Sequence, residues 1–165
     1  MMETSQSVPE LVATAQANVK PHEDQIAEIL RLMDGQTGSD DQLKELHTAT
    51  SAIEYLSVDI FAAFEARMQH HFKRGPFSRK LKALLTGAGQ PDLAHRIYQY
   101  YLAINVLKHG IGVSHRELLE TPNSLFIVKR TNDSDAPSSL IDVTTPGFFD
   151  GLSSTILESY HFLER

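Results

Sequence analysis

The feature that most constrains the fold is a long run of apolar residues spaced three and four positions apart. Over residues 41–73 the run comprises Leu43, Leu46, Ile53, Leu56, Ile60, Phe64, Met68 and Phe72. This spacing places apolar side chains on one face of a helix. At 1.5 Å per residue, a helix of this length spans roughly 45–50 Å. Such a helix is typical of the spine of a helical bundle, so we predict a mostly-α fold.

Further helices are predicted on both sides of this spine. The same periodicity indicates helices over 9–33, 77–85, 92–109 and 114–119, and a last helix that begins at Thr145–Pro146. Pro21 predicts a break or kink near Val19–Lys20. In the short helix 114–119, Ser114 and Glu117 have the spacing of a capping box. We expect residues 1–8 to be disordered.

Two short segments differ from the helical pattern. Residues 125–129, L-F-I-V-K, and residues 140–144, L-I-D-V-T, have the composition of strands. We predict that they pair antiparallel as a β-hairpin insertion over 124–144, before the last helix. The sequence therefore predicts a single helical-bundle domain over 1–165 with a two-stranded insertion.

Composition excludes several classes of protein. The chain has no cysteine, so it has no disulfides, thiolate nucleophiles or cysteine zinc sites. Its first residues, M-M-E-T-S-Q-S-V-P-E, lack the apolar core of a signal peptide. No run of residues is long and apolar enough for a membrane helix. We expect a cytoplasmic protein with no membrane association.

Charge is distributed unevenly along the chain, whose formal net charge is −6. Residues 66–116 hold nine Lys or Arg and one acid, a net +8, so the remainder carries −14. Two interpretations stay open: a positive face that binds a polyanion such as RNA, or an excess that balances acidic neighbours in the fold. Three acids of the spine helix do not share a face and are interpreted as solvated or as partners of the basic segment: Glu54, Asp59 and Glu65.

The strongest candidate site is the end of the predicted helix 92–109. Tyr101, Asn105 and His109 recur at steps of four, which places them on one stripe of the helix. A neutral histidine can transfer protons near pH 7, Asn105 can bind a phosphate oxygen, and Lys108 can offset negative charge. Such a set could support metal-independent RNA cleavage. The alternative is simple helix termination, with Lys108 and His109 complementing the helix dipole and Gly110 as the stop.

Two further groups are interpreted as structural. His70 and His71 are adjacent, so on a helix they point to different faces, and no carboxylate stands at the spacing of a zinc motif. We therefore predict no metal site and no cofactor. Tyr98, Tyr100 and Tyr101 lie beside basic residues and could stack on bases. Packing in the core or at a subunit interface is the preferred interpretation.

The chain resembles a known family in these regions. The stretch Y-Y-L-A-I-N-V-L-K-H-G, followed by S-H-R-E-L-L, resembles the end of the third main helix of HEPN-like bacterial proteins. The segments F-I-V-K-R, L-I-D-V-T and F-F-D-G-L resemble the strand pair and final helix of one group of that family. The resemblance covers about residues 41–162. It implies a helical bundle, usually a homodimer, whose polar helix end faces a cleft between subunits.

Active members of the family are metal-independent RNases, often toxins or proteins of phage defence. Their motif is an Arg followed by a polar residue and, a few positions later, a His. Asn105 and His109 match the polar residue and the His, whereas the Arg position holds Ile104. The resemblance implies that His109 is the acid/base and Asn105 positions the phosphate. Lys108 or Arg96 would then supply the positive charge.

The leading hypothesis is a HEPN-like homodimer linked to RNA or to defence and toxin–antitoxin biology, with metal-independent endoribonuclease activity an open question. Arg96, Tyr101 and Arg67 are predicted to contact RNA. One alternative is a non-catalytic regulatory module that binds a protein partner, which the missing Arg favours. Another is a small-molecule-binding bundle with a pocket lined by Tyr98, Tyr101 and Asn105.

Overall fold

The structure, a computed structural model, describes residues 6–122, 125–130 and 140–165. In these ranges six α-helices, a 3-10 turn and a two-stranded sheet follow one another as α1 (Val8–Met33), α2 (Asp40–Met68), η1 (Gln69–His71), α3 (Phe77–Gly87), α4 (Pro91–His109), α5 (Val113–Glu120), β1 (Ile127–Val128), β2 (Ile141–Asp142) and α6 (Phe148–Glu164). The predicted mostly-α fold, with an antiparallel strand pair before the last helix, is confirmed.

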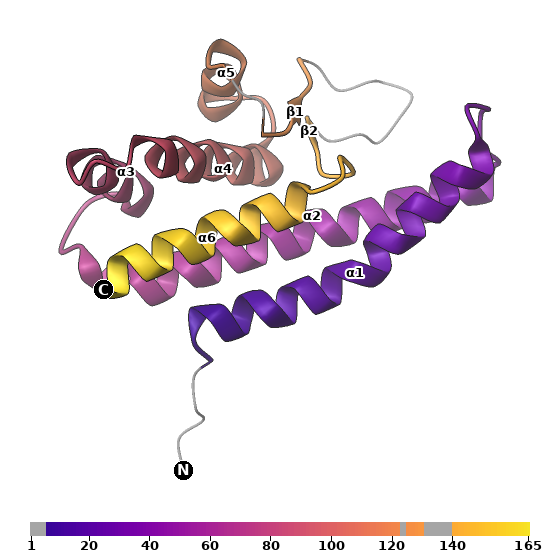
Figure 1. Cartoon of the computed structure of the whole chain (residues 1–165). Coiled ribbons are helices and arrows are strands. Elements are labelled where there is room, and N and C mark those ends of the chain that lie inside the picture. Colours follow the sequence, from indigo (N-terminus) through magenta and orange to yellow (C-terminus); the bar gives the residue numbers. More distant parts are fainter. Residues whose placement is uncertain (1–5, 123–124, 131–139) are drawn as a thin grey trace.

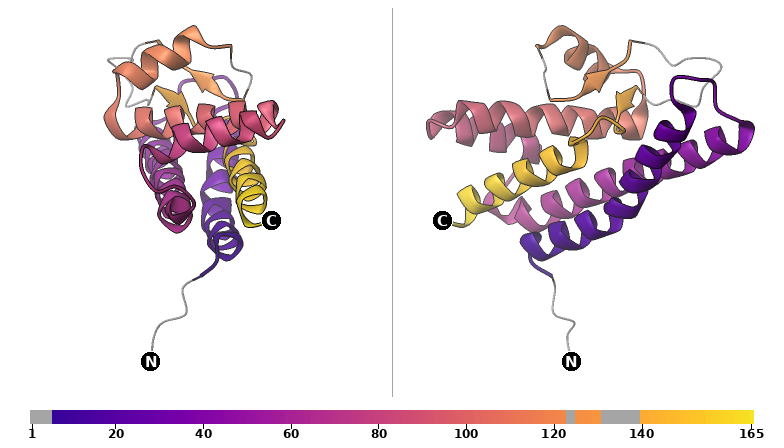
Figure 2. Two further views of the ribbon diagram at one scale, coloured as in Figure 1. Left: turned by 90° about the vertical axis from the view of Figure 1, so that its left-hand side faces the viewer. Right: turned by 45° about the vertical axis from the view of Figure 1, so that its right-hand side comes forward.

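The helices form two layers (Figures 1 and 2). α1, α2 and α6 lie side by side, and α4 crosses over α2 and α6 with α3 beside it. The core lies between the layers, and burial of each large apolar side chain stabilises it by about 1.5–3 kcal/mol. Its largest fully buried members include Ile53, Phe61, Phe64, Leu81, Ile97, Leu102, Phe148 and Leu152. Among the described residues, no helix has both the length and the apolar character needed to cross a membrane.

The first helix begins earlier than predicted and is continuous. Ser7 caps α1 by accepting a bond from the Glu10 backbone N–H, and Val8 is buried, so the prediction of disorder up to residue 8 is wrong at these two positions. Residues 1–5 lie outside the described residues. α1 also runs through Pro21 as one helix, so of the predicted break or kink the break is absent, whereas the ribbon changes direction part-way along α1 (Figure 1). Pro21 and Ala17 are both exposed, and the carbonyl that lacks its helical partner can therefore face water.

The spine helix is shorter than its apolar pattern. α2 begins at the capping box of Ser39 and Gln42 and ends at Met68, where η1 takes over. Phe72 then adopts an extended backbone and packs its ring against Phe77, with centroids 5.5 Å apart. Phe72 therefore continues the apolar series of the sequence without continuing the helix.

The central helix α4 is buried on more than one side. Its Tyr100 ring packs against Phe126 and Phe148, with centroids 5.4 and 6.0 Å away. Gly151 on α6 makes this approach feasible, because a Cβ at that position would lie 2.3 Å from the Tyr100 hydroxyl. The single buried stripe expected from the sequence therefore underestimates how much of α4 is covered.

The two strands are shorter than predicted, and α6 begins later than predicted. Ile127 pairs with Asp142 and Val128 with Ile141, so each strand is two residues long. Part of the predicted insertion, residues 123–124 and 131–139, lies outside the described residues. The last helix begins at Phe148, after Gly147 with φ +87°, and not at Thr145–Pro146.

Candidate functional site

The end of α4 carries the side chains predicted as the candidate site. Lys108 and His109 are exposed in the last turn, and the helix ends at Gly110, whose φ is +73°. Asn105, one turn earlier, is half-buried and donates from Nδ2 to Ser114 Oγ at 3.2 Å. The structure thus brings Asn105, Lys108 and His109 to one helix end, with the amide held in place from α5.

The short helix α5 begins differently from the prediction. Its N-cap is Gly112, with no capping bond from a side chain, so the predicted capping box of Ser114 and Glu117 is wrong. Ser114 lies inside the first turn, where its hydroxyl accepts the bond from Asn105. On the same helix, buried His115 bonds through Nε2 to the carbonyl of Lys129 at 2.7 Å. The polar groups of α5 therefore fix its position against α4 and the strand pair.

A carboxylate of α2 belongs to the surroundings of Lys108. Glu65 is half-buried, and its Oε2 accepts a long bond of 3.5 Å from Ser78 Oγ. Burial raises the pKa of Glu65, while the charge of Lys108 and the bond from Ser78 act in the opposite direction. Of the two predicted alternatives for Glu65, solvation or a partner in the basic segment, the second agrees with the structure, because Lys108 belongs to that segment and Glu65 is only half-exposed where Ser78 of α3 contacts it.

Arg96 is not brought to the end of α4. Its guanidinium makes a bidentate ion pair with Glu158 on α6, at 2.7 and 2.9 Å, and also donates to Thr155 at 3.2 Å. These bonds lower the pKa of Glu158. The structure thus gives Arg96 a role in joining α4 to α6, away from Lys108 and His109.

The other two predicted RNA contacts are also engaged within the fold. Arg67 donates to the backbone carbonyl of Gln6. Tyr101 is half-buried, with its ring centroid 6.5 Å from Phe61 and 5.5 Å from Tyr98. The preferred interpretation of the tyrosines as packing residues is confirmed for Tyr98, which is 7% exposed.

Basic side chains are exposed along α3, α4, α5 and the connection before α3, although Lys82 lies over the Tyr98 ring, 4.1 Å from its centroid, and Arg79 also bonds Tyr98. Of the nine Lys and Arg in residues 66–116, seven are exposed: Lys73, Arg74, Arg79, Lys80, Lys82, Lys108 and Arg116. Two apolar residues are exposed next to His109, Ile111 at 62% and Val113 at 68%. The end of α4 therefore combines positive charge with a small apolar corner.

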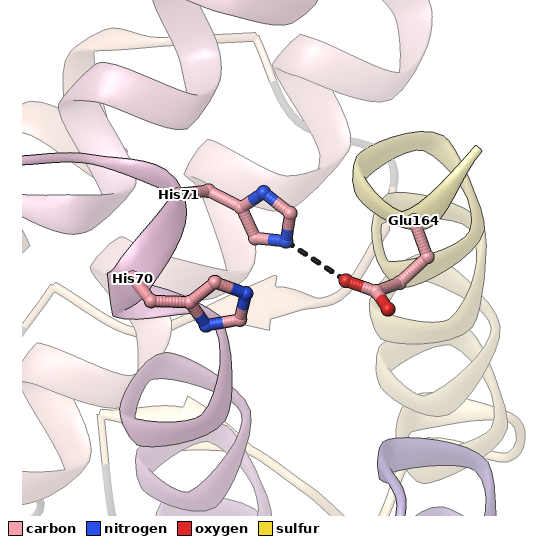
Figure 3. Close-up of side chains that lie close together, drawn as sticks. All are labelled: His70, His71 and Glu164. Carbon is pink, nitrogen blue, oxygen red and sulfur yellow. Dashed lines mark hydrogen bonds and ion pairs between the residues drawn. The ribbon is translucent and has the colours of Figure 1, made fainter.

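A second cluster of polar side chains, drawn in Figure 3, lies where α2 passes into η1 and where α6 ends. His71 Nε2 lies 2.8 Å from Glu164 Oε2, and the rings of His70 and His71 have centroids 4.2 Å apart. The expectation that the two histidines point to different helix faces is wrong, because α2 ends at Met68 and η1 turns both rings to one side. The histidine pair was visible in the sequence, but nothing in it pointed to a carboxylate 93 residues away.

Comparisons of the chain with models of protein families, with curated proteins and with solved structures gave no match.

Proposed function

We propose that the chain is an RNA-associated protein of the HEPN-like type that cleaves RNA without a metal ion at the end of α4. One observation supports this most strongly. Lys108 and His109 are both exposed beside Asn105, whose amide is held by Ser114. The end of the helix thus offers a proton-transfer group, a cation and an oriented hydrogen-bond donor within two turns.

In the proposed reaction His109 takes the proton of an RNA 2′-hydroxyl. The 2′-oxygen forms a bond to the adjacent phosphorus, and the bond from phosphorus to the 5′-oxygen breaks. The proton passes to that leaving oxygen, so the products are a 2′,3′-cyclic phosphate and a 5′-hydroxyl. Lys108 stabilises the charge that develops on the phosphate, and Asn105 positions a phosphate oxygen.

The exposed basic side chains of residues 66–116 support RNA as the substrate. Seven exposed Lys and Arg side chains lie in the segment that forms α3, α4, α5 and their connections. Contacts from such side chains to phosphates provide affinity without sequence preference and weaken as salt increases. We therefore expect RNA binding to weaken between 50 and 200 mM salt, by a factor that grows with the number of phosphate contacts.

The test is cleavage of a mixed RNA substrate in EDTA. Wild type should cleave, and His109→Ala should be slower by about 10²–10⁴-fold, the usual contribution of one general acid–base group. His95→Ala is the matched control, because His95 is exposed on the same helix and should leave the rate unchanged. Equal cleavage by wild type and His109→Ala would contradict the proposal.

A second candidate function is a protein-interaction module without catalysis. It is favoured by the exposed apolar corner of Ile111 and Val113 and by Ile104, which is buried where the family motif has Arg. RNA binding without cleavage would favour this candidate over the nuclease, and so would the absence of both RNA binding and cleavage.

We also propose that the protein is a homodimer joined at this corner. Two apolar side chains next to the polar end of α4 would then place that end in a cleft between subunits. Light scattering at micromolar concentration should give a dimer mass for wild type and a smaller mass for Ile111→Ser with Val113→Ser. A monomer mass for wild type would exclude the dimer.

A further inference from the structure

We infer that His70, His71 and Glu164 form a binding site for a zinc-type transition-metal ion that joins the end of α2 to the end of α6. This inference is independent of the proposed nuclease, which uses other residues. One potential ligand atom from each of the three side chains lies within 4.8 Å of the other two. Figure 3 shows the two imidazoles on one side and the Glu164 carboxylate opposite them.

The distances are close to those that a metal requires. Ligand atoms bound tetrahedrally at 2.0–2.1 Å from zinc lie about 3.3–3.4 Å from one another. The existing contact between His71 Nε2 and Glu164 Oε2, 2.8 Å long, is slightly shorter than this, and the limit of 4.8 Å for the group is longer. Small rotations of side chains at the surface are therefore enough to close the site around an ion.

The contact between His71 and Glu164 also prepares the site. Glu164 holds the ring through the nitrogen that would bind the metal, so a metal would replace a shared proton without moving the backbone. His70 adds a second imidazole at the same point, with its ring 4.2 Å from that of His71. An ion pair alone does not need this second ring, whereas a metal site does.

The charges around the site determine which type of cation it can bind. α2 and α6 both end at this point (Figure 1), and the C-terminal ends of helices carry partial negative charge. Lys73 and Arg74 follow closely in the chain and are exposed, so net charge adds little attraction. The affinity must then come from imidazole–metal bonds, which favour Zn²⁺ and its neighbours over Mg²⁺ or Ca²⁺.

The chemical consequence is a three-ligand site at the surface. Two histidines and one glutamate leave a fourth position open to water or to another donor. Because its ligands come from α2–η1 and from the last turn of α6, the ion would fasten the end of the last helix to the spine. We expect bound metal to raise the melting temperature of the whole chain.

The test is titration of the full-length, untagged protein with Zn²⁺, followed by calorimetry and by thermal unfolding. We expect one ion per chain with a dissociation constant below about 100 μM and an increase in melting temperature. Mg²⁺ should give no saturable heat. Co²⁺ should develop visible absorption that reports bound imidazole and carboxylate.

Matched variants decide whether these residues bind the ion. His70→Ala, His71→Ala and Glu164→Gln should each weaken Zn²⁺ binding about tenfold or more. His47→Ala and His95→Ala remove exposed histidines from α2 and α4 and should leave binding unchanged. Circular dichroism establishes that each variant is folded. Equal losses in the control variants, or no binding by wild type, would overturn the proposal.

Discussion

The two histidine-bearing sites are assembled from residues at very different separations along the chain. At the end of α4, Asn105, Lys108 and His109 come from two turns of one helix, and their spacing is visible in the sequence. At the ends of α2 and α6, His71 meets a carboxylate 93 residues further along. The first arrangement follows from helical periodicity, whereas the second exists only because two long helices end together.

The two sites also differ in their surroundings. His109 is exposed at a helix terminus, five residues after Ile104, a core position that is 4% exposed. His71 is 24% exposed by its side chain and is already paired. Substitutions at the end of α4 therefore test how far burial in the core restricts which residues a site can contain. Substitutions on η1 test how far the pairing of His71 with Glu164 does so.

The largest effect is expected when an arginine, the residue that the HEPN-like RNase motif has before its polar residue, replaces the buried Ile104. Ile104→Arg should destabilise the protein by about 3–5 kcal/mol, because it buries a charge without a partner. Chemical denaturation should show a much lower midpoint, and the rate of RNA cleavage should not rise above that of wild type. This would mean that burial of position 104 prevents the end of α4 from carrying the arginine of the HEPN-like RNase motif.

The matched control is His70→Arg, which adds the same side chain at an exposed position. Its stability should remain within about 0.5 kcal/mol of wild type. If Ile104→Arg is as stable as this control, the core does not restrict position 104, and the expected difference between the two sites is absent.

The next effect in size concerns the packing of α4 on α6. Gly151→Ala should destabilise by about 1–3 kcal/mol, because its Cβ would lie 2.3 Å from the Tyr100 hydroxyl. Adding Tyr100→Phe removes that oxygen and leaves the nearest ring carbon at 3.5 Å, so the double variant should recover much of the loss. Denaturation midpoints of the four proteins in this cycle give the coupling energy. Additive effects would contradict the close approach.

Much of the fold was predictable because its main signals are local. Apolar periodicity located α2, α3 and α4, composition located the two strands, and Gly110 marked the end of α4. The end of α2 was misplaced because Phe72 keeps the apolar spacing while its backbone is extended. The ion pair of Arg96 was missed for a different reason: its partner Glu158 is 62 residues away, and no local pattern identifies such a pair.

The third prediction concerns the ion pair between α4 and α6. The pair lowers the pKa of Glu158, so its contribution to stability is complete above the ordinary value of 4.5 and is lost as pH falls below it. Because the Glu158 side chain is 51% exposed, solvent limits the contribution to roughly 0.2–1 kcal/mol. Arg96→Met should lower stability by this amount at pH 7 and by less at pH 3. A loss that is independent of pH would show that packing, and not charge, is the main effect.

The smallest effect is expected at Glu65, near the charge of Lys108. Burial raises the pKa of Glu65, so its folded form binds a proton more tightly than its unfolded form. Stability therefore falls as pH rises from the ordinary value of 4.5 through the raised one, and the ionised carboxylate carries a cost at pH 7. Glu65→Gln should stabilise the protein at pH 7 by a few tenths of a kcal/mol and not below pH 4.

Lys108→Ala tests whether Lys108 and Glu65 interact. Lys108 opposes the upward shift in the pKa of Glu65, so removing its charge should make wild-type Glu65 more costly at pH 7. In the Glu65→Gln background the same substitution should have no pH-dependent effect on stability. Denaturation of all four proteins at pH 4 and pH 7 measures this coupling. Zero coupling would mean that Lys108 is free of Glu65 and that its charge is directed entirely at solvent or at a bound phosphate. A measurable coupling would mean that the cation at the end of α4 is partly neutralised by α2, and that RNA must compete with Glu65 for it.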